Sequence, residues 1–327
     1  MSRAMITGNW GDFVKGVSAK IDEVIDQTKD LGPNFGQSGL FDEVTTDSLI
    51  YRTEGVTGLN YLENFDENDG IKKDVTYPAY KTEYVANQKG SIVEISQLLM
   101  KTRPSDLEQK LDEIRQLRIT ANRTLNKWAW RPLVDAFVTT DSSSEYPVSR
   151  LSDAVAMCAS THPSLVTGVS NRSNIVTGAP ALSEANLFTA QKQLMEALNG
   201  RGLPINYEGG YILVVPPALV KTAVEITKSE LRSGTGNNDI NYFDSAVNID
   251  VVSSTYLGSA NGGDENNWFL FARDLDSSMK PMKVVTLIEP KIEKTVDFDT
   301  KSIRVSVDLA AAVGYSSWEF MMGSNPA

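Results

Sequence analysis

The sequence has very little of the chemistry that enzymes and metal proteins commonly use. Its 327 residues include one cysteine, Cys158, and one histidine, His162. A single cysteine cannot form a disulfide within the chain, which indicates an intracellular folding environment or, at the least, folding that does not depend on oxidation. One histidine and one cysteine cannot supply the set of ligands that a structural zinc ion takes. We therefore expect no metal and no cofactor.

Long apolar runs are also missing. The longest stretch, YILVVPPALV, is interrupted by Pro216 and Pro217, and no run approaches the roughly 20 residues that cross a membrane. The opening residues, MSRAMITGNWGDF, contain no apolar core of the kind that a secretory signal needs. We expect no membrane partner.

Positive charge is in short supply. The chain carries 31 lysines and arginines against 42 aspartates and glutamates, which gives a formal net charge of -11. An acidic chain gains nothing from the counterion release that drives binding to phosphate backbones, so sequence-independent DNA binding is disfavoured. The length exceeds the roughly 250–300 residues at which one core stops growing, so more than one lobe is expected.

Two helices are predicted by their apolar spacing. Residues 12–31 form an amphipathic helix that Gly32 and Pro33 end. Residues 104–130 form a much longer helix, which Ser105 and Glu108 are expected to start as a capping box. Its apolar stripe comprises Leu107, Leu111, Ile114, Leu117, Ala121, Leu125 and Trp128. A helix this long and this one-sided is expected to be a structural beam.

The second half of the chain mixes helices and strands. Ser183 is expected to start a helix that Gly200 ends, and Pro217 to open another after the buried strand YILVVPP. Further strands are predicted in SAVNIDVVSS, NNWFLFARD, MKVVTLIE, KIEKTVDF and SIRVSVDL. There is no steady alternation of strand and helix, so the pattern is α+β, with the late strands returning to the long helix.

Residues 50–96 are predicted to form an extended arm with little to bury. Its charged stretch, LENFDENDGIKKDV, contains Asn68-Asp69-Gly70, which is turn chemistry. We regard this turn as a candidate contact with another chain, together with the arginines on the polar side of the long helix. The candidate residues are Glu63, Asp66, Glu67, Asp69, Lys72, Lys73, Arg115, Arg118 and Arg123.

Each sign of active-site chemistry has a simpler interpretation. His162, with Ser160, Ser164 and Asp153 nearby, could form a hydrolase triad, but its sequence STHPS is typical of a polar turn. The segment NFDENDG resembles a calcium loop, yet its glycine falls one place late. The Gly-rich segments 232–238 and 258–267 lack the lysine of a phosphate-binding loop.

Asp297 and Asp299 form the last candidate pair. They alternate on a predicted strand, so both would lie on one side. With no other group to complete a paired-carboxylate site, they are interpreted as a solvated or interfacial face.

The order of elements resembles the tailed-phage major capsid proteins of the Hong Kong 97-type fold, and the second half resembles relatives of the Mu-type major head subunit. The resemblance covers residues 160–327 by motif order and residues 50–130 by architecture. It is carried by THPS (161–164), SNIVTGAPALSEANLFTAQKQL (173–194), YILVVPPALVKTAVEI (211–226), NIDVVSSTYLGS (248–259), NNWFLFARD (266–274) and SIRVSVDLAAAVGYSSWEFMMG (302–323). Glu319 departs from it, because an arginine is expected after Trp318.

The resemblance implies a division of the chain. The parts are an N-terminal arm (1–49), an extended loop (50–96), a peripheral domain (97–160) with a spine helix (104–130), an axial domain (161–274) and return strands of the peripheral domain (275–327). The extended loop would lie over a neighbouring copy of the protein. In some relatives lysine and asparagine cross-link the subunits, and Lys72 or Lys73 would be the candidates here.

The implied function is a non-enzymatic one in the virion. The chain would assemble in the host bacterial cytoplasm, as pentamers and hexamers, into an icosahedral shell around double-stranded DNA that it does not bind specifically. The short segment before the extended loop implies a separate scaffolding protein, and a portal and decoration proteins are further partners. The alternatives are an encapsulin-type compartment shell, a hydrolase that uses His162, and a monomeric binding module.

Overall fold

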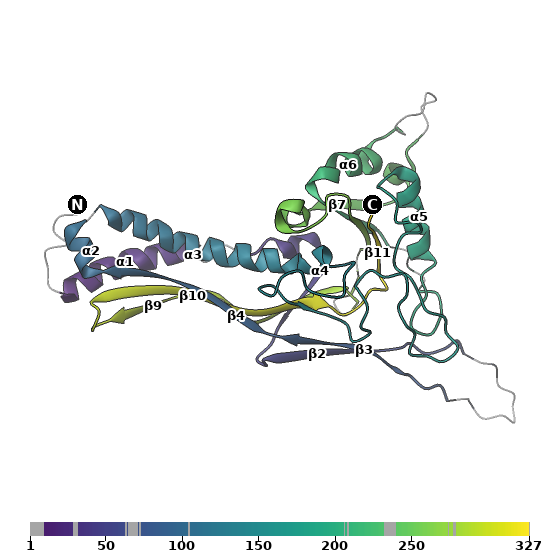
Figure 1. Ribbon diagram of the computed structural model, residues 1–327, viewed down its shortest axis with the longest axis horizontal. Coiled ribbons are helices and arrows are strands. Elements are labelled where there is room, and N and C mark those ends of the chain that lie inside the picture. Colours follow the sequence, from purple (N-terminus) through teal and green to yellow (C-terminus); the bar gives the residue numbers. More distant parts are fainter. Residues whose placement is uncertain are drawn as a thin grey trace.

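The structure is a computed structural model with two sheets, a separate hairpin and helices on their faces (Figure 1). It describes residues 10–28, 32–62, 64, 71, 73–103, 105–205, 207, 209–231, 240–273, 275–276 and 279–326. An elongated part carries the larger sheet and the long helix, and a lobe at one end carries the smaller sheet (Figure 1).

The elongated part is built on a sheet in the order β1-β9-β10-β4, with β5 pairing at the end of β10. Its strands are β1 (Phe41–Thr45), β4 (Asn87–Ser96), β5 (Val148–Ser149), β9 (Met282–Asp297) and β10 (Ser302–Tyr315). Its helical elements are α1 (Trp10–Thr28), η2 (Phe35–Ser38), α2 (Gln97–Thr102), α3 (Asp106–Ala129) and α4 (Arg131–Val134). The long helix α3 lies along this sheet, and α1 packs beside α3 (Figure 1).

The predicted return of the late strands to the long helix is confirmed. Ile303, Val305, Val307 and Leu309 alternate along β10 and are all buried. They share one core with the buried stripe of α3 and with the apolar side of α1. Each large side chain buried in this way contributes roughly 1.5–3 kcal/mol, so the amphipathic helices are held by the sheet rather than by propensity alone.

The capping box expected at the start of α3 is not formed. Ser105 has helical backbone angles and its side chain accepts no capping hydrogen bond. Its hydroxyl instead donates to Asp106 Oδ1 at 3.2 Å. Glu108, the expected second member, forms an ion pair with Lys20 of α1 at 3.2 Å. A contact between helices has replaced the local one.

Two predicted strands, MKVVTLIE and KIEKTVDF, are one strand, β9. Pro290 lies between the two predicted segments, and the 16-residue strand runs through it. The pairing of β9 with β10 is irregular at this point, where Lys291 faces Asp308 and Ile288 faces Ala310. A bulge lets a strand carry a proline, which cannot donate a ladder hydrogen bond.

The lobe contains the smaller sheet, in the order β11-β8-β6-β7. Its strands are β6 (Tyr211–Val215), β7 (Ile249–Ser253), β8 (Trp268–Ala272) and β11 (Met321–Ser324). Its helical elements are α5 (Glu184–Met195), η3 (Pro217–Leu219), α6 (Val220–Lys228), α7 (Tyr242–Ser245), η4 (Thr255–Leu257) and η5 (Ser259–Asn261). As predicted, β6 is wholly buried and Ser183 caps α5 by accepting from the Asn186 amide.

Gly200 does not end α5, contrary to the prediction. The helix stops at Met195, and the chain then folds back on itself so that Leu198 bridges Pro204. The smaller sheet lies between two cores, because Ile212 and Val214 of β6 face the larger core and Leu213 and Val215 face the core under α5. This explains why both faces of β6 are apolar.

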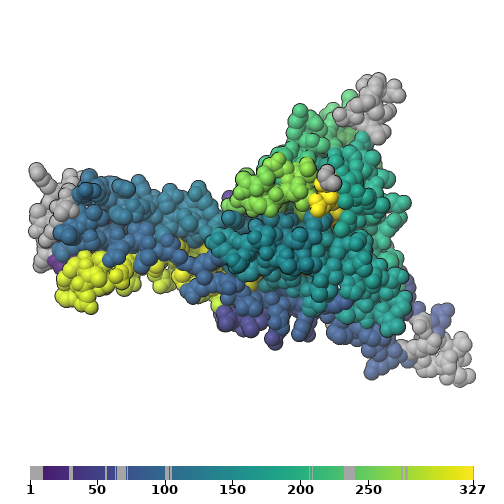
Figure 2. Space-filling model, in the orientation of Figure 1, coloured from purple at the N-terminus to yellow at the C-terminus, as the bar shows by residue number. Residues whose placement is uncertain are grey.

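The hairpin of β2 (Ile50–Val56) and β3 (Pro78–Val85) is separate from both sheets and projects along the lower edge of the molecule (Figures 1 and 2). Two strands pair with strands that the expected division assigns to other parts of the chain. The strand β4, within the predicted extended loop, pairs with β10 over ten residue pairs. The strand β11, within the predicted return strands, pairs with β8 of the lobe. Met321 of β11 is buried in the larger core, and Met322 is buried in the core under α5. The domain boundaries stay predictions.

Gly314 of β10 has no space for a side chain, and Gly314→Ala is expected to destabilise the protein. A β-carbon there would overlap the carbonyl oxygen of Ser149, which pairs with Gly314 in the sheet. Overpacking of this kind costs about 1–3 kcal/mol. Thermal unfolding of the variant measures the loss. Gly32→Ala is the control, because nothing lies within 4 Å of a β-carbon there, and an equal loss in both variants would contradict the steric explanation.

Candidate functional site

The segments beyond the projecting hairpin carry apolar side chains that the chain does not bury in its own cores. Leu59, Tyr61 and Leu62, which follow β2, are 60%, 68% and 101% exposed. Val75 and Tyr77, on the returning segment, are about half exposed, at 55% and 45%. Apolar side chains gathered on a projection of this kind mark a contact with another molecule.

We call the β2–β3 hairpin and the segments beyond it, residues 50–85, the arm. Hydrogen bonds hold its outgoing and returning segments together beyond the point where the backbone ladder ends. The last paired residues are Val56 and Pro78. Beyond them the Thr57 amide donates to the Tyr77 carbonyl at 2.9 Å, and the Tyr77 amide donates to the Thr57 hydroxyl at 3.0 Å. Farther out, Asp74 Oδ2 accepts from the Asn60 amide at 2.7 Å. The arm is thus closed by Thr57 and Asp74 where the ladder no longer closes it.

Asp74 is also bound from the lobe. Arg201, from the turn after α5, lies with its Nη1 3.0 Å from Asp74 Oδ1. Its Nη2 donates to the Val75 carbonyl, and its guanidinium carbon lies 5.4 Å from the centre of the Tyr77 ring. The Arg201 side chain is 10% exposed. One arginine therefore contacts three residues of the arm, Asp74, Val75 and Tyr77.

These contacts set the pH dependence of the arm. The Asn60 amide, and then the Val75 amide and Arg201, hold the pKa of Asp74 below its ordinary value of 3.8. A carboxyl group with a lowered pKa stabilises the folded state above its ordinary pKa, and that contribution is lost as the pH falls through the lowered value. We therefore expect the arm to be closed at neutral pH and to open only below pH 3.8.

The amide resonance of Asn60 reports this opening. It is expected to move toward its disordered position as the pH falls from about 7 to about 2, following the Asp74 titration. In Asp74→Asn, which cannot titrate, the transition should be absent. A resonance that stays unchanged in the original chain over this range would contradict the role given to Asp74.

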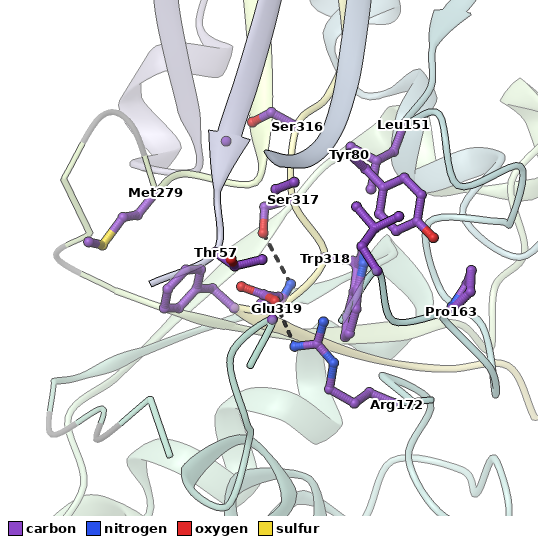
Figure 3. Close-up of a pocket in the computed structure, with 15 residues that line it drawn as sticks. Thr57, Tyr80, Leu151, Pro163, Arg172, Met279, Ser316, Ser317, Trp318 and Glu319 are labelled. Atoms are coloured by element: carbon purple, nitrogen blue, oxygen red, sulfur yellow. Dashed lines mark hydrogen bonds and ion pairs between the residues drawn. The ribbon is translucent and has the colours of Figure 1, made fainter. Parts of the chain in front are cut away.

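A cavity of about 310 Å³ lies at the base of the arm, where the hairpin, the elongated part and the lobe meet (Figure 3). Tyr80 of β3 and Thr57 line it from the arm, and Trp318 and Glu319 line it from the segment between β10 and β11. Arg172 crosses it and forms an ion pair with Glu319 at 2.7 Å (Figure 3). Glu319, which departs from the expected arginine, is thus paired with an arginine from elsewhere in the chain.

His162, interpreted from the sequence as a residue of a polar turn, is completely buried beside this cavity. Its ring stacks on Trp318, with centroids 4.0 Å apart and planes 11° apart. Arg172 lies against the same tryptophan, its guanidinium carbon 4.6 Å from the ring. The histidine is buried because a tryptophan far along the chain covers it.

Both ring nitrogens of His162 face acceptors. Nδ1 lies 3.0 Å from Asp153 Oδ2, and Nε2 lies 3.1 Å from Asn174 Oδ1. The Asn174 amide is oriented by the backbone, because its nitrogen donates to the Met157 carbonyl at 2.8 Å and its oxygen accepts from the Ala159 amide at 2.9 Å. Because the Asn174 oxygen is an acceptor, Nε2 of His162 carries a proton, and Nδ1 forms the hydrogen bond with the Asp153 carboxyl group.

This arrangement does not support a hydrolase triad. The acid that the sequence placed near His162 is indeed its partner, but the second ring nitrogen is taken by Asn174. The Ser164 hydroxyl makes its hydrogen bonds with Val166. A general base needs a ring nitrogen within reach of the nucleophile, and both nitrogens of His162 are already used.

The candidate contact residues are described only in part. Glu63, Asp66, Glu67, Asp69 and Lys72 lie outside the described residues, as do the turn Asn68-Asp69-Gly70 and most of the calcium-like segment. Lys73 is exposed. Arg115 pairs with Asp112 within α3, Arg118 is half-buried and Arg123 is exposed. The hairpin β2–β3 runs away from α3 (Figure 1).

The remaining sequence candidates have structural roles where they are described. Asp297 Oδ1 accepts from the amides of Asp299 and Thr300 in the turn after β9, and its other oxygen lies 3.3 Å from Arg304. The segment 232–238 lies outside the described residues. In the part of the chain with described placement, no group of three acidic, histidine or cysteine side chains could hold a metal ion. No described helix is long and apolar enough to cross a bilayer.

Several buried charged groups were not identified from the sequence. Arg131 and Asp135 form a buried ion pair at 3.0 Å within α4 and the residue after it, and both contact Ser142. Lys283 of β9 pairs with Asp42 of β1. The spacing of Arg131 and Asp135 is a signal that sequence reasoning can use, whereas Arg201 and Asp74 have none.

Comparisons with known proteins identify the family and the fold of the chain. A family model described as phage capsid protein matches residues 79–321. No curated protein sequence matches the chain. The structure from Mycobacterium phage Patience is 11% identical, with a TM-score of 0.53, and the match covers 97% of this chain and 87% of that one.

Two other solved structures show the same likeness. The capsid of cyanophage P-SCSP1u is 15% identical, with a TM-score of 0.52 and coverage of 91% of this chain and 89% of that one. The capsid of the native GTA particle is 10% identical, with a TM-score of 0.52 and coverage of 91% and 93%. At these identities the likeness shows a shared fold.

Proposed function

The chain belongs to the phage capsid protein family, and we propose that it is the major shell subunit of a tailed-bacteriophage head, which assembles with copies of itself around double-stranded DNA. The predicted Hong Kong 97-type capsid fold is confirmed by the solved capsids that it resembles. Pentamers and hexamers of an icosahedral shell are the assembly that we propose.

The arm carries this proposal. Leu59, Tyr61 and Leu62 have no core of their own chain to enter and are more than half exposed. A neighbouring copy supplies the missing cover in a shell, where every subunit both offers an arm and receives one. The same surface on a monomeric protein would be an aggregation hazard.

The candidate charges are assigned to the same contact. The acidic turn would meet the arginines Arg115, Arg118 and Arg123 of a neighbouring α3, and Lys72 and Lys73 would lie at the margin of the contact. Exposed ion pairs contribute roughly 0–1 kcal/mol each, so these charges fix the register of the arm while its apolar side chains supply the affinity.

The remaining partners follow from a shell of this kind. They are a separate scaffolding protein, a portal, decoration proteins and packaged DNA that is not bound specifically. The net charge of -11 supports a wall to which DNA does not adhere. Assembly would take place in the host bacterial cytoplasm, and we propose no enzymatic activity.

Negative-stain electron microscopy of the purified chain tests this function. Closed shells, tubes or rings of five or six subunits are the expected result. A chain that stays monomeric when it is expressed with a scaffolding protein would overturn the proposal. Particles that contain an enzyme instead of DNA, when isolated from the original host, would favour the encapsulin-type alternative.

A further inference from the structure

We propose that Arg201 is a positioning residue that fixes the direction of the arm in the single subunit, before any neighbour binds. This inference rests on the proposed function only for its consequence, because the contact itself lies within one chain. Arg201 comes from the lobe, whereas Asp74, Val75 and Tyr77, which it contacts, belong to the arm.

The arm needs a second attachment because its first one lies only at its base. There the Thr82 hydroxyl donates to the Tyr315 carbonyl at 2.9 Å. Lys81 and Ser152 also exchange two hydrogen bonds, at 2.9 and 3.1 Å. All these residues lie on the body side of Pro78, where the ladder of the hairpin ends. A two-stranded ribbon attached at one end alone bends and twists freely beyond that end.

Asp74 makes the second attachment effective for both segments of the arm. Its two oxygens accept from Asn60 on the outgoing segment and from Val75 on the returning one, at 2.7 and 2.8 Å. Arg201 binds the same carboxylate. Holding Asp74 therefore holds both segments, which a contact with one segment would not do.

The turn that carries Arg201 is built to hold it in place. The Asn199 side-chain oxygen accepts from the amides of Arg201 and Leu203, at 2.9 and 3.1 Å. The Asn199 amide donates to the Leu203 carbonyl at 2.7 Å, and Gly202 adopts a φ of +80°, which favours glycine. A side chain at Gly200 would overlap Thr57, so the turn packs directly on the arm.

A fixed direction matters because ordering an arm during assembly costs free energy that a preorganised arm has already lost. With Arg201 in place, the arm of a free subunit already points where a neighbour receives it. Without Arg201, each arm must be ordered when subunits meet. We therefore expect Arg201→Ala to loosen the arm and to raise the protein concentration needed for shells.

Hydrogen exchange on the unassembled subunit tests the contact itself. In Arg201→Ala, the amides of Asn60, Val75 and Tyr77 are expected to exchange about tenfold faster or more, while those of β6 and β8 are unchanged. Asp74→Asn removes the same ion pair from the arm side, so it should give the same pattern even if Arg201→Ala disturbs the lobe. Lys192→Ala is the control, because Lys192 forms an exposed ion pair with Glu196 on the same lobe.

Assembly of the same variants tests the consequence. Arg201→Ala and Asp74→Asn are expected to need about a tenfold higher concentration than the original chain or Lys192→Ala to form shells. Unchanged exchange in both variants would overturn the proposal that Arg201 holds the arm. Faster exchange with unchanged assembly would overturn the proposal that this contact preorganises the arm for assembly. If the original chain forms no particles, the proposed function fails, and the exchange measurement still decides whether Arg201 holds the arm.

Discussion

Asp153→Ala is expected to lower the free energy of unfolding by about 1–3 kcal/mol, the usual cost of leaving a buried hydrogen-bonding group without its partner. The side chains of Asp153 and His162 are each 1% exposed. Without this carboxyl group, Nδ1 of His162 has no hydrogen-bond partner in a space that water does not reach. A buried polar group is then left unsatisfied.

Urea unfolding of the unassembled subunit measures this loss. Asp153→Asn is the informative companion variant, because its amide can donate to a neutral histidine and so should lose less, about 1–2 kcal/mol. Glu196→Ala, at an exposed position, should change little. A loss below about 1 kcal/mol in Asp153→Ala would contradict the role given to this buried hydrogen bond.

The elements predicted well are those whose burial follows a local period. The stripe of α3 and the alternation of β10 each place their apolar residues on one side, and each side is buried as expected. The strand β6 is apolar on both sides and is covered on both sides. In these elements the pattern in the chain and the surrounding structure carry the same information.

Two of the predictions that were wrong depended on residues distant in the chain. Glu108 does not cap its own helix because Lys20, 88 positions away, binds it. His162 is not solvated because Trp318 covers it. Neither Lys20 nor Trp318 belongs to the motif from which the prediction was made, so a local motif could not reveal these contacts.

The contacts of the candidate site could not be predicted from local motifs either. The sequence identified the arm by its charged turn and its lack of apolar spacing. The contacts of Asp74 with Asn60 and Arg201 join residues 14 and 127 positions apart (74 − 60 and 201 − 74) and follow no spacing rule. Asp74 and Arg201 are ordinary surface charges in the sequence, and only the fold brings them together.

Replacing Leu59, Tyr61 and Leu62 together by serine is expected to abolish shells at any concentration up to about a thousandfold above that needed by the original chain. Each large apolar side chain that a neighbour buries contributes roughly 1.5–3 kcal/mol, and about 1.4 kcal/mol corresponds to a factor of ten in affinity. The three residues are exposed in the subunit, so their loss should leave its own unfolding free energy nearly unchanged.

Sedimentation and electron microscopy measure shells, and urea unfolding measures the subunit. Val138→Ser is the control, because Val138 is also exposed, at 45%, but lies outside the arm. A triple variant that assembles normally would remove the arm from the assembly contact, whatever the fold implies. A variant that fails to assemble and also unfolds would show that the arm stabilises its own chain. Only failed assembly with an intact subunit assigns these side chains to the contact with a neighbouring subunit. Exposed apolar side chains that do not stabilise their own chain have a function only when another chain covers them.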